Sequence, residues 1–106
     1  MNKYHAKKTE FNGIKFDSKH ERDRYVELLL MEKAQAIQDL KTQVRFPLIP
    51  KSKYGREIYY LADFTYYENG KLVVEDAKSP ITHKNRIYRL KFRMMQETYN
   101  ITIKET

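Results

Sequence analysis

"EIYYLADFTYYENGKLVVEDAK", residues 57–78, decides the fold of this chain. Residues 57–67 are rich in the aromatic and β-branched side chains that favour strands, and residues 71–78 begin with a short valine-containing run. Between the two runs, Asn69-Gly70 is the strongest short hairpin signal that we identify in the chain. The stretch therefore predicts an antiparallel hairpin whose second strand ends in charged side chains.

The turn also predicts the register of this hairpin. If the Asn-Gly pair forms a two-residue turn, Glu68 pairs with Lys71, and counting back along both strands places Asp63 directly opposite Asp76. Because side chains alternate between faces, Lys78 shares the face of Asp76. A slip of one residue or a bulge would instead separate the two carboxylates.

Two facing carboxylates repel each other, so their proximity needs a reason. Directly opposed Cβ atoms lie about 5 Å apart, where two negative charges repel by about 3 kcal/mol at an effective dielectric constant of about 20. A divalent cation would offset this repulsion, and oxygen ligands are those that Mg²⁺ and Mn²⁺ prefer. Lys78 can balance the charge and contact a phosphate. The alternative is a solvated sheet edge at which Asp63 and Asp76 pair with lysines.

Two helices are predicted, one on each side of the strand-rich region. Residues 17–36 have a helical pattern, and Ser18 and Glu21 have the spacing of a capping box at its start. Residues 82–99 have a second helical pattern, with Thr82 as a candidate N-cap.

Shorter segments complete the expected architecture. Residues 43–49 predict a strand, which Pro47 restricts to a sheet edge or a bulge. Residues 13–16 and 101–105 predict short strands, and residues 1–12 a flexible basic arm. The order is helix, three strands, helix, strand, which predicts a single α/β domain over residues 1–106 with a central sheet and two flanking helices.

Glu21 has two interpretations. As the second residue of a capping box it needs no further role. It also lies four residues before Tyr25 and seven before Leu28, at the head of an apolar stripe that faces the sheet. In the second interpretation, Glu21 brings a third carboxylate to the predicted acidic pair.

The second predicted helix carries much of the positive charge. From Lys78 to Gln96 the chain has six basic residues and no acidic one. At helical spacing, three arginines share one face and two lysines lie between the apolar stripes. These residues are either the solvated face of a core helix or a surface for phosphates: Lys84, Arg86, Arg89, Lys91 and Arg93.

The bulk composition narrows the classes of partner and location. A length of 106 residues and a net charge of +7 indicate one domain that favours polyanions, nucleic acid before anionic membranes. The chain has no cysteine, no apolar run that could span a bilayer and no signal-peptide pattern. We therefore expect a soluble cytoplasmic protein without a membrane partner. No P-loop, dinucleotide-binding glycine pattern or nucleophile elbow is present.

The combination of these elements resembles the PD-(D/E)XK nuclease superfamily. The residues that carry the resemblance are Glu21 in a helix, Asp63 in a strand, and Asp76 and Lys78 in the following strand. The segments "FDSKHERDRYVEL", "YLADFTY" and "VEDAK" are similar to those of small phage-encoded proteins catalogued as a domain of unknown function. The resemblance covers about residues 11–105 and is akin to the Holliday-junction-resolvase branch of the superfamily.

The resemblance implies a restriction-endonuclease-like αβββαβ core and a role for each motif residue. Asp63, Asp76 and the backbone carbonyl of Ala77 would bind Mg²⁺ or Mn²⁺, with Glu21 as a metal or water ligand. Lys78 would orient the attacking water and stabilise the charge that grows on the phosphate. Two departures are the D-x-K form in place of the commoner E-x-K, and Ala62 in place of the superfamily's proline.

The expected function is a metal-dependent endonuclease that hydrolyses phosphodiester bonds of DNA, with branched or recombination structures as candidate substrates. A homodimer is expected for junction cutting, because opposed strands need two active sites. Phage origin would place the protein in the cytoplasm of a bacterial host. The alternatives are a non-catalytic DNA-binding or regulatory module on the same fold and a protein–protein adaptor with a basic helix.

Overall fold

The structure, a computed structural model, describes residues 9–78 and 85–106. It is an α/β fold with a mixed four-stranded sheet, in the order β3-β4-β5-β6, and a separate antiparallel sheet of β1 and β2. In chain order the elements are β1 (Thr9–Phe11), β2 (Ile14–Phe16), α1 (Lys19–Lys33), β3 (Gln38–Ile49), β4 (Ile58–Glu68), β5 (Lys71–Asp76), α3 (Arg86–Tyr99) and β6 (Lys104–Glu105).

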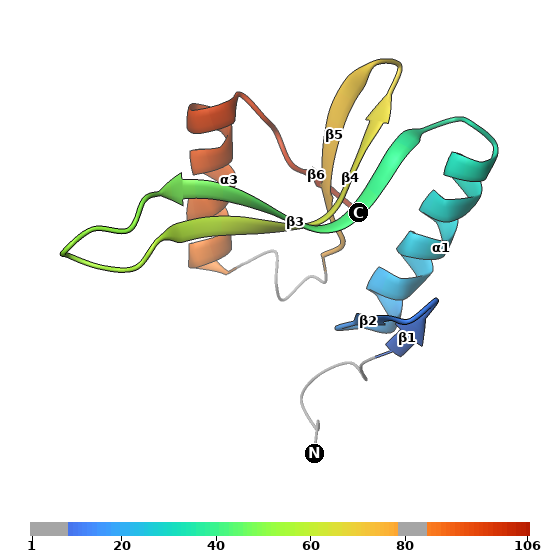
Figure 1. The fold of residues 1–106 in the computed structure, drawn as a ribbon, viewed down its shortest axis with the longest axis horizontal. Coiled ribbons are helices and arrows are strands. Elements are labelled where there is room, and N and C mark those ends of the chain that lie inside the picture. Colours follow the sequence, from blue (N-terminus) through green and yellow to red (C-terminus); the bar gives the residue numbers. More distant parts are fainter. Residues whose placement is uncertain (1–8, 79–84) are drawn as a thin grey trace.

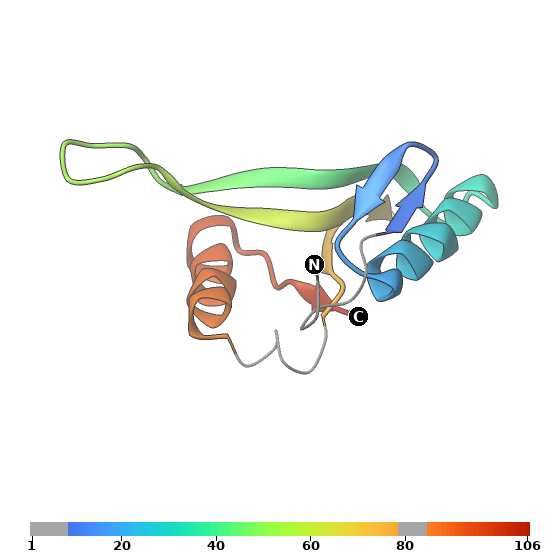
Figure 2. The same cartoon turned by 90° about the horizontal axis from the view of Figure 1, so that it is seen from below.

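The long ribbon of β3 and β4 organises the molecule. The two helices lie at opposite ends of this ribbon, and β5 and β6 lie between them (Figures 1 and 2). Each helix covers its own apolar cluster: Tyr25 and Leu28 of α1 pack with Phe64 of β4, whereas Tyr88 and Met95 of α3 pack in the other cluster. The expected order of helix, three strands, helix and strand is found, preceded by the small β1–β2 sheet.

The predicted hairpin register is confirmed as far as the strands are paired. Glu68 faces Lys71, and the pairing continues to Phe64 opposite Glu75. Asn69 and Gly70 have positive φ angles of 52° and 77°, as a type I′ turn requires. The next step of the same register brings Asp63 to the level of Asp76.

The N-terminal region differs from the expected arm. Residues Thr9–Phe11 form β1 and pair with β2, so the arm cannot extend to residue 12. The turn between the strands is Asn12-Gly13, with φ angles of 54° and 77°. Asn12-Gly13 is the same type of turn signal as Asn69-Gly70, but the polar composition of residues 1–12 gives no strand pattern on its N-terminal side. The rest of the predicted arm, residues 1–8, lies outside the described residues.

The ends of several elements were predicted imperfectly. Helix α1 ends at Lys33, three residues before the end of the predicted helical pattern, and β3 begins at Gln38 rather than at residue 43. Its extra residues pair with β4 through a bulge between Gln38 and Lys41, which the sequence pattern does not reveal. Pro47 lies in β3 as expected, since β3 is an edge strand and a second irregularity lies beside Pro47.

The C-terminal elements are shorter than predicted. Helix α3 begins at Arg86, and the side chain of Asn85 caps it by accepting hydrogen bonds from the backbone of Ile87 and Tyr88. The predicted cap Thr82 lies outside the described residues. Strand β6 is limited to Lys104–Glu105, and it pairs parallel to β5.

A buried ion pair joins α1 to the sheet. Glu75 is fully buried, and its carboxylate accepts hydrogen bonds from Arg24 Nε, Arg24 Nη2 at 3.3 Å and the hydroxyl of Tyr66 at 2.6 Å. Glu75 therefore has a structural partner on the face opposite to Asp76. The two consecutive acidic residues of β5, Glu75 and Asp76, are therefore held on opposite faces of the strand by different partners.

Arg24→Met is expected to destabilise the fold by about 3–5 kcal/mol, because it leaves the carboxylate of Glu75 buried without its charged partner. Chemical denaturation measures this change. The control is Arg22→Met, since Arg22 pairs at 2.8 Å with Asp23, whose side chain is 54% exposed, and an exposed pair contributes about 0–1 kcal/mol. Equal free energies of unfolding for the two variants would contradict a structural role of the Arg24–Glu75 pair.

Candidate metal centre

Asp63, Asp76 and Lys78 come together where β4 and β5 separate. The carboxyl groups of Asp63 and Asp76 are near enough to each other for Asp76 to raise the pKa of Asp63, after the larger effect of burial. The backbone N–H of Ala77 donates a 2.9 Å hydrogen bond to Asp63 Oδ2, which ties the end of β5 to β4. The structure thus brings together the two aspartates that the hairpin register predicted, with Ala77 beside them.

The ammonium group of Lys78 lies within the same cluster. Its Nζ is 3.1 Å from Asp76 Oδ2 and 3.9 Å from the centre of the Tyr88 ring of α3. The hydroxyl of Tyr60 donates a 2.6 Å hydrogen bond to the same Asp76 oxygen. Asp76 is 3% exposed, so Lys78 and Tyr60 together compensate a buried negative charge.

Asp63 retains a proton near neutral pH. Burial is the largest cause, and with the hydrogen bond and negative charge of Asp76 it raises the pKa of Asp63 to about 9. Glu21 adds to the upward shift of this pKa, whereas the hydrogen bond from Ala77 opposes it. A carboxyl group that keeps its proton beside a second, buried carboxylate marks a position at which positive charge is favoured.

Glu21 reaches this cluster from the first turn of α1. Its backbone N–H donates to Ser18 Oγ at 3.1 Å, so the predicted N-cap is present. Glu21 as a whole is 6% exposed, and no hydrogen bond joins its carboxyl group to another residue within residues 9–78 and 85–106, so the return bond of a capping box is absent. Burial, followed by the charges of Asp17 and Asp76, raises the pKa of Glu21 to about 7.

The donor set suits a hard divalent cation. In the described part of the chain, no group of three or more Asp, Glu, His or Cys side chains is arranged to hold a metal ion. Mg²⁺ commonly uses only one or two carboxylates and keeps several water molecules. Asp63 and Asp76 meet that smaller requirement, and Glu21 is close enough for its charge to add to the effect of burial on the pKa of Asp63.

The metal-free protein should lose stability as the pH rises from about 5 to 9. Glu21 and Asp63 hold protons in the folded state that they lose in the unfolded state, because their folded pKa values are raised to about 7 and about 9. Each such proton lowers the free energy of unfolding by about 1.4 kcal/mol per pH unit within its window. Thermal melts at each pH measure the trend.

Mg²⁺ should reverse this loss, most strongly at pH 9, because the cation replaces protons that the carboxylates no longer hold. The matched control is Asp76→Asn, whose melting temperature should respond little to Mg²⁺. Stability that rises with pH without metal, or melts unaffected by Mg²⁺ at pH 9, would count against a cation site.

Glu21→Gln should lower DNA cleavage at least about a hundredfold, about 2.7 kcal/mol of transition-state stabilisation, while the melting temperature at pH 7 stays the same or rises. Glutamine resembles the protonated carboxyl group that burial favours, so only the charge is lost. The control on the same helix is Glu27→Gln, since the Glu27 side chain is 66% exposed. If both variants cleave DNA at the normal rate, Glu21 has no role in catalysis and serves only in the first turn of α1.

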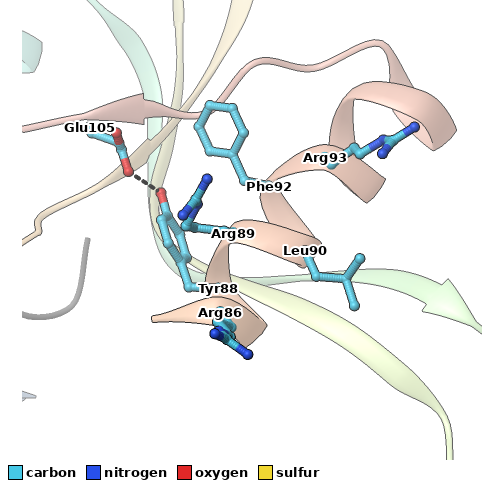
Figure 3. Close-up of a pocket in the computed structure, with 7 residues that line it drawn as sticks. All are labelled: Arg86, Tyr88, Arg89, Leu90, Phe92, Arg93 and Glu105. Atoms are coloured by element: carbon cyan, nitrogen blue, oxygen red, sulfur yellow. Dashed lines mark hydrogen bonds between the residues drawn. The ribbon is translucent and has the colours of Figure 1, made fainter. Parts of the chain in front are cut away.

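The predicted basic surface is only partly in place. Arg86, Arg89 and Arg93 are exposed on α3, beside the hydrogen bond that the Tyr88 hydroxyl donates to Glu105 at 2.7 Å (Figure 3). Lys91 lies elsewhere, with its Nζ 5.8 Å from the centre of the Tyr59 ring on β4. Lys84 lies outside the described residues. The three arginines therefore form one surface, and Lys91 belongs to a different one.

Sequence reasoning missed the two tyrosines of the cluster. Tyr60 and Tyr88 are 3% and 8% exposed, and this burial raises the pKa of each hydroxyl well above its ordinary value. The second cause of the raised pKa is the negative charge of Asp76 for Tyr60 and the hydrogen bond to Glu105 for Tyr88. Neither tyrosine has a local signal. Tyr60 lies three residues before Asp63, so strict alternation along the predicted strand would place it on the other face. The contact of Tyr88 with Lys78 depends on how α3 packs.

Comparisons with known proteins give one match. The model of a protein family described as "Protein of unknown function (DUF1064)" matches residues 1–105. Neither the curated proteins nor the solved structures contain a match. Among the described residues, neither helix is long and apolar enough to cross a membrane.

Proposed function

We propose that this chain, which belongs to the DUF1064 family, is a Mg²⁺- or Mn²⁺-dependent endodeoxyribonuclease of the PD-(D/E)XK type. Branched or recombination DNA is the proposed substrate. One observation carries the proposal: the carboxylate of Asp63, which accepts a hydrogen bond from the backbone of Ala77, lies beside the buried Asp76, and the Lys78 ammonium is 3.1 Å from Asp76. Paired carboxylates for a cation, with a fixed positive charge beside them, are what phosphodiester hydrolysis requires.

The roles of the residues follow from their positions. Asp63 and Asp76 would hold the cation, and the carbonyl of Ala77 remains a proposed further ligand. When bound, Mg²⁺ or Mn²⁺ would polarise the phosphate and lower the pKa of a water molecule. Lys78 is held in place by Asp76 and by the ring of Tyr88, so its charge is directed at the same spot as the carboxylates.

Hydrolysis forms one phosphorus–oxygen bond from water and breaks one ester bond. Glu21, with a pKa of about 7, can accept the proton that the attacking water loses. Lys78 can stabilise the negative charge that grows on the phosphate oxygens. The leaving alkoxide takes a proton from solvent, so the products are a phosphate monoester and an alcohol.

A cleavage assay tests the proposal. Supercoiled plasmid and a synthetic four-way junction are incubated with the protein in Mn²⁺, Mg²⁺ or EDTA. We expect nicked plasmid and cut junction arms in the presence of either metal and none in EDTA. The Asp76→Asn variant, purified in the same way, controls for a contaminating nuclease.

The two competing functions give different results in the same experiment. Binding to DNA without cutting in any metal would overturn the nuclease proposal in favour of a non-catalytic DNA-binding module. Absence of DNA affinity at low salt would overturn both and favour the protein–protein adaptor. If junctions are cut on opposed strands, the protein should be a symmetric dimer on the junction, which sedimentation of the complex measures.

A further inference from the structure

Strands β3 and β4 end at Ile49 and Ile58, beyond the part that α3 covers, and the chain between them continues outward as a loop. Phe46, Leu48 and Tyr60 belong to the apolar cluster under α3, but Ile49 and Ile58 are already 45% and 42% exposed. The segment from residue 49 to 58 forms an arm that extends away from both helices (Figures 1 and 2). With about 3.3 Å of rise per residue, four or five residues on each side give it a reach of about 15 Å.

The tip of the arm has a defined turn. Ser52 and Gly55 exchange backbone hydrogen bonds of 3.0 and 3.2 Å, and the backbone N–H of Tyr54 donates to Ser52 Oγ at 3.1 Å. Tyr54 is 87% exposed, with Lys53 Nζ 5.1 Å from the centre of its ring. The arm thus presents its tip residues in an ordered conformation, although it buries almost nothing.

Positive charge is concentrated on this tip. Residues 50–56 contain Lys51, Lys53 and Arg56 and no acidic residue. All three side chains are exposed, and within the part of the chain that the structure describes no ion pair joins any of them to a carboxylate. At the base of the arm, by contrast, Arg45 is paired with Glu57. Within the arm and its base, the cations without a carboxylate partner are therefore those at the tip.

We propose that residues 49–58 are a DNA-binding arm that enters the major groove of double-stranded DNA. The major groove is about 12 Å wide and about 8.5 Å deep and admits a two-stranded β-ribbon, whereas the minor groove, about 6 Å wide, does not. Lys51, Lys53 and Arg56 then contact the phosphates along both edges of the groove. This inference takes DNA as the partner from the proposed function, and it names duplex DNA as the form that is gripped.

The position of the arm relative to Asp63 follows from β4, which contains Asp63 and whose first residue, Ile58, is the last residue of the arm. From Asp63 to Tyr54 the chain spans nine residues, up to about 30 Å of strand. One turn of B-form DNA is about 34 Å. The arm therefore contacts the duplex up to about one helical turn from the phosphate at the acidic pair.

Two variants with equal loss of charge test the arm. The arm variant carries Lys51→Ser, Lys53→Ser and Arg56→Ser. The control variant carries Lys15→Ser, Lys33→Ser and Lys71→Ser, which remove three exposed positive charges from β2, α1 and β5. Binding in EDTA is measured by fluorescence anisotropy for duplex DNA, single-stranded DNA and double-stranded RNA of the same sequence, with circular dichroism melts to verify folding.

The arm variant should bind duplex DNA at least about tenfold more weakly than the control variant, and its logarithmic salt slope should fall by about 2 to 3, at about 0.9 per phosphate contact. Double-stranded RNA should be bound equally by both variants, because the major groove of an A-form helix is too narrow for the ribbon. The wild type should protect guanine N7, a major-groove atom, from methylation by dimethyl sulfate, and the arm variant should not.

Equal binding of duplex DNA by the two variants would overturn the arm proposal, as would equal losses on duplex DNA and double-stranded RNA. Wild-type protein without affinity for duplex DNA would also overturn it. Cleavage in Mn²⁺ is scored separately. Selective loss of DNA binding by the arm variant, with no cutting by the wild type, supports the arm and defeats the nuclease. If the wild type cuts DNA but the two variants bind duplex DNA equally, the nuclease proposal is supported and the arm proposal is overturned.

Discussion

Asp76→Asn is expected to abolish metal-dependent DNA cleavage, with a loss of at least about a thousandfold, or about 4 kcal/mol of transition-state stabilisation. Asp63→Asn should behave in the same way. Each variant removes one of the two carboxylates proposed to hold the cation, and a neutral amide is a much weaker ligand for Mg²⁺. Initial rates on supercoiled plasmid and calorimetric titration with Mn²⁺ measure the two losses.

The same variants should keep or gain stability, which separates a metal site from a structural one. In Asp76→Asn the amide oxygen can still accept the hydrogen bond from Tyr60, and the amide N–H can donate to Asp63. The variant also removes the negative charge of Asp76, which adds to the effect of burial in raising the pKa of Asp63. A loss of several kcal/mol in unfolding free energy, with no Mn²⁺ bound by the wild type, would make the pair structural.

Asp39→Asn is the matched control for these substitutions. Asp39 is exposed on β3, where it pairs at 3.7 Å with Lys41. Its φ angle of 57° lies in the left-handed region, which asparagine also tolerates. The control should therefore cleave DNA and melt like the wild type.

Lys78→Met should lower the cleavage rate by about a hundredfold to a thousandfold, the usual effect of removing one group that stabilises charge in a transition state. Metal affinity should change little, because Lys78 is not a ligand. Methionine keeps an unbranched stem against the ring of Tyr88, so the loss reflects the ammonium group rather than packing. Two quantities are measured for the wild type and for Lys78→Met: the cleavage rate at saturating Mn²⁺ and the affinity for Mn²⁺.

Lys104→Met provides the control for Lys78, since Lys104 is exposed on β6 next to β5. It should leave both the rate and the metal affinity unchanged. Full activity of Lys78→Met would remove Lys78 from the mechanism. A parallel loss of rate and Mn²⁺ affinity would instead assign it to the structure of the metal site.

Local sequence determined the part of the fold on which the acidic pair depends. Asn69-Gly70 has the backbone conformation that its residue types favour, and a turn of defined length sets the pairing of every residue on the two strands beside it. For that reason the meeting of Asp63 and Asp76 could be predicted from residues within 14 positions of each other. The start of α1 at Ser18 is equally local, because the cap acts within one helical turn.

Tertiary packing decided what those residues experience. The buried carboxyl group of Glu21, the Arg24–Glu75 pair and the Tyr88 ring beside Lys78 each join an element to a distant one. The bulge that lets β3 begin at Gln38 and the parallel pairing of β6 with β5 are also long-range. Turn and cap preferences act over a few residues, whereas burial and charge pairing depend on which surfaces meet. The sequence by itself therefore determined that two aspartates face each other, and only the tertiary structure surrounded them with the low-polarity environment that raises the pKa values of Asp63 and Glu21.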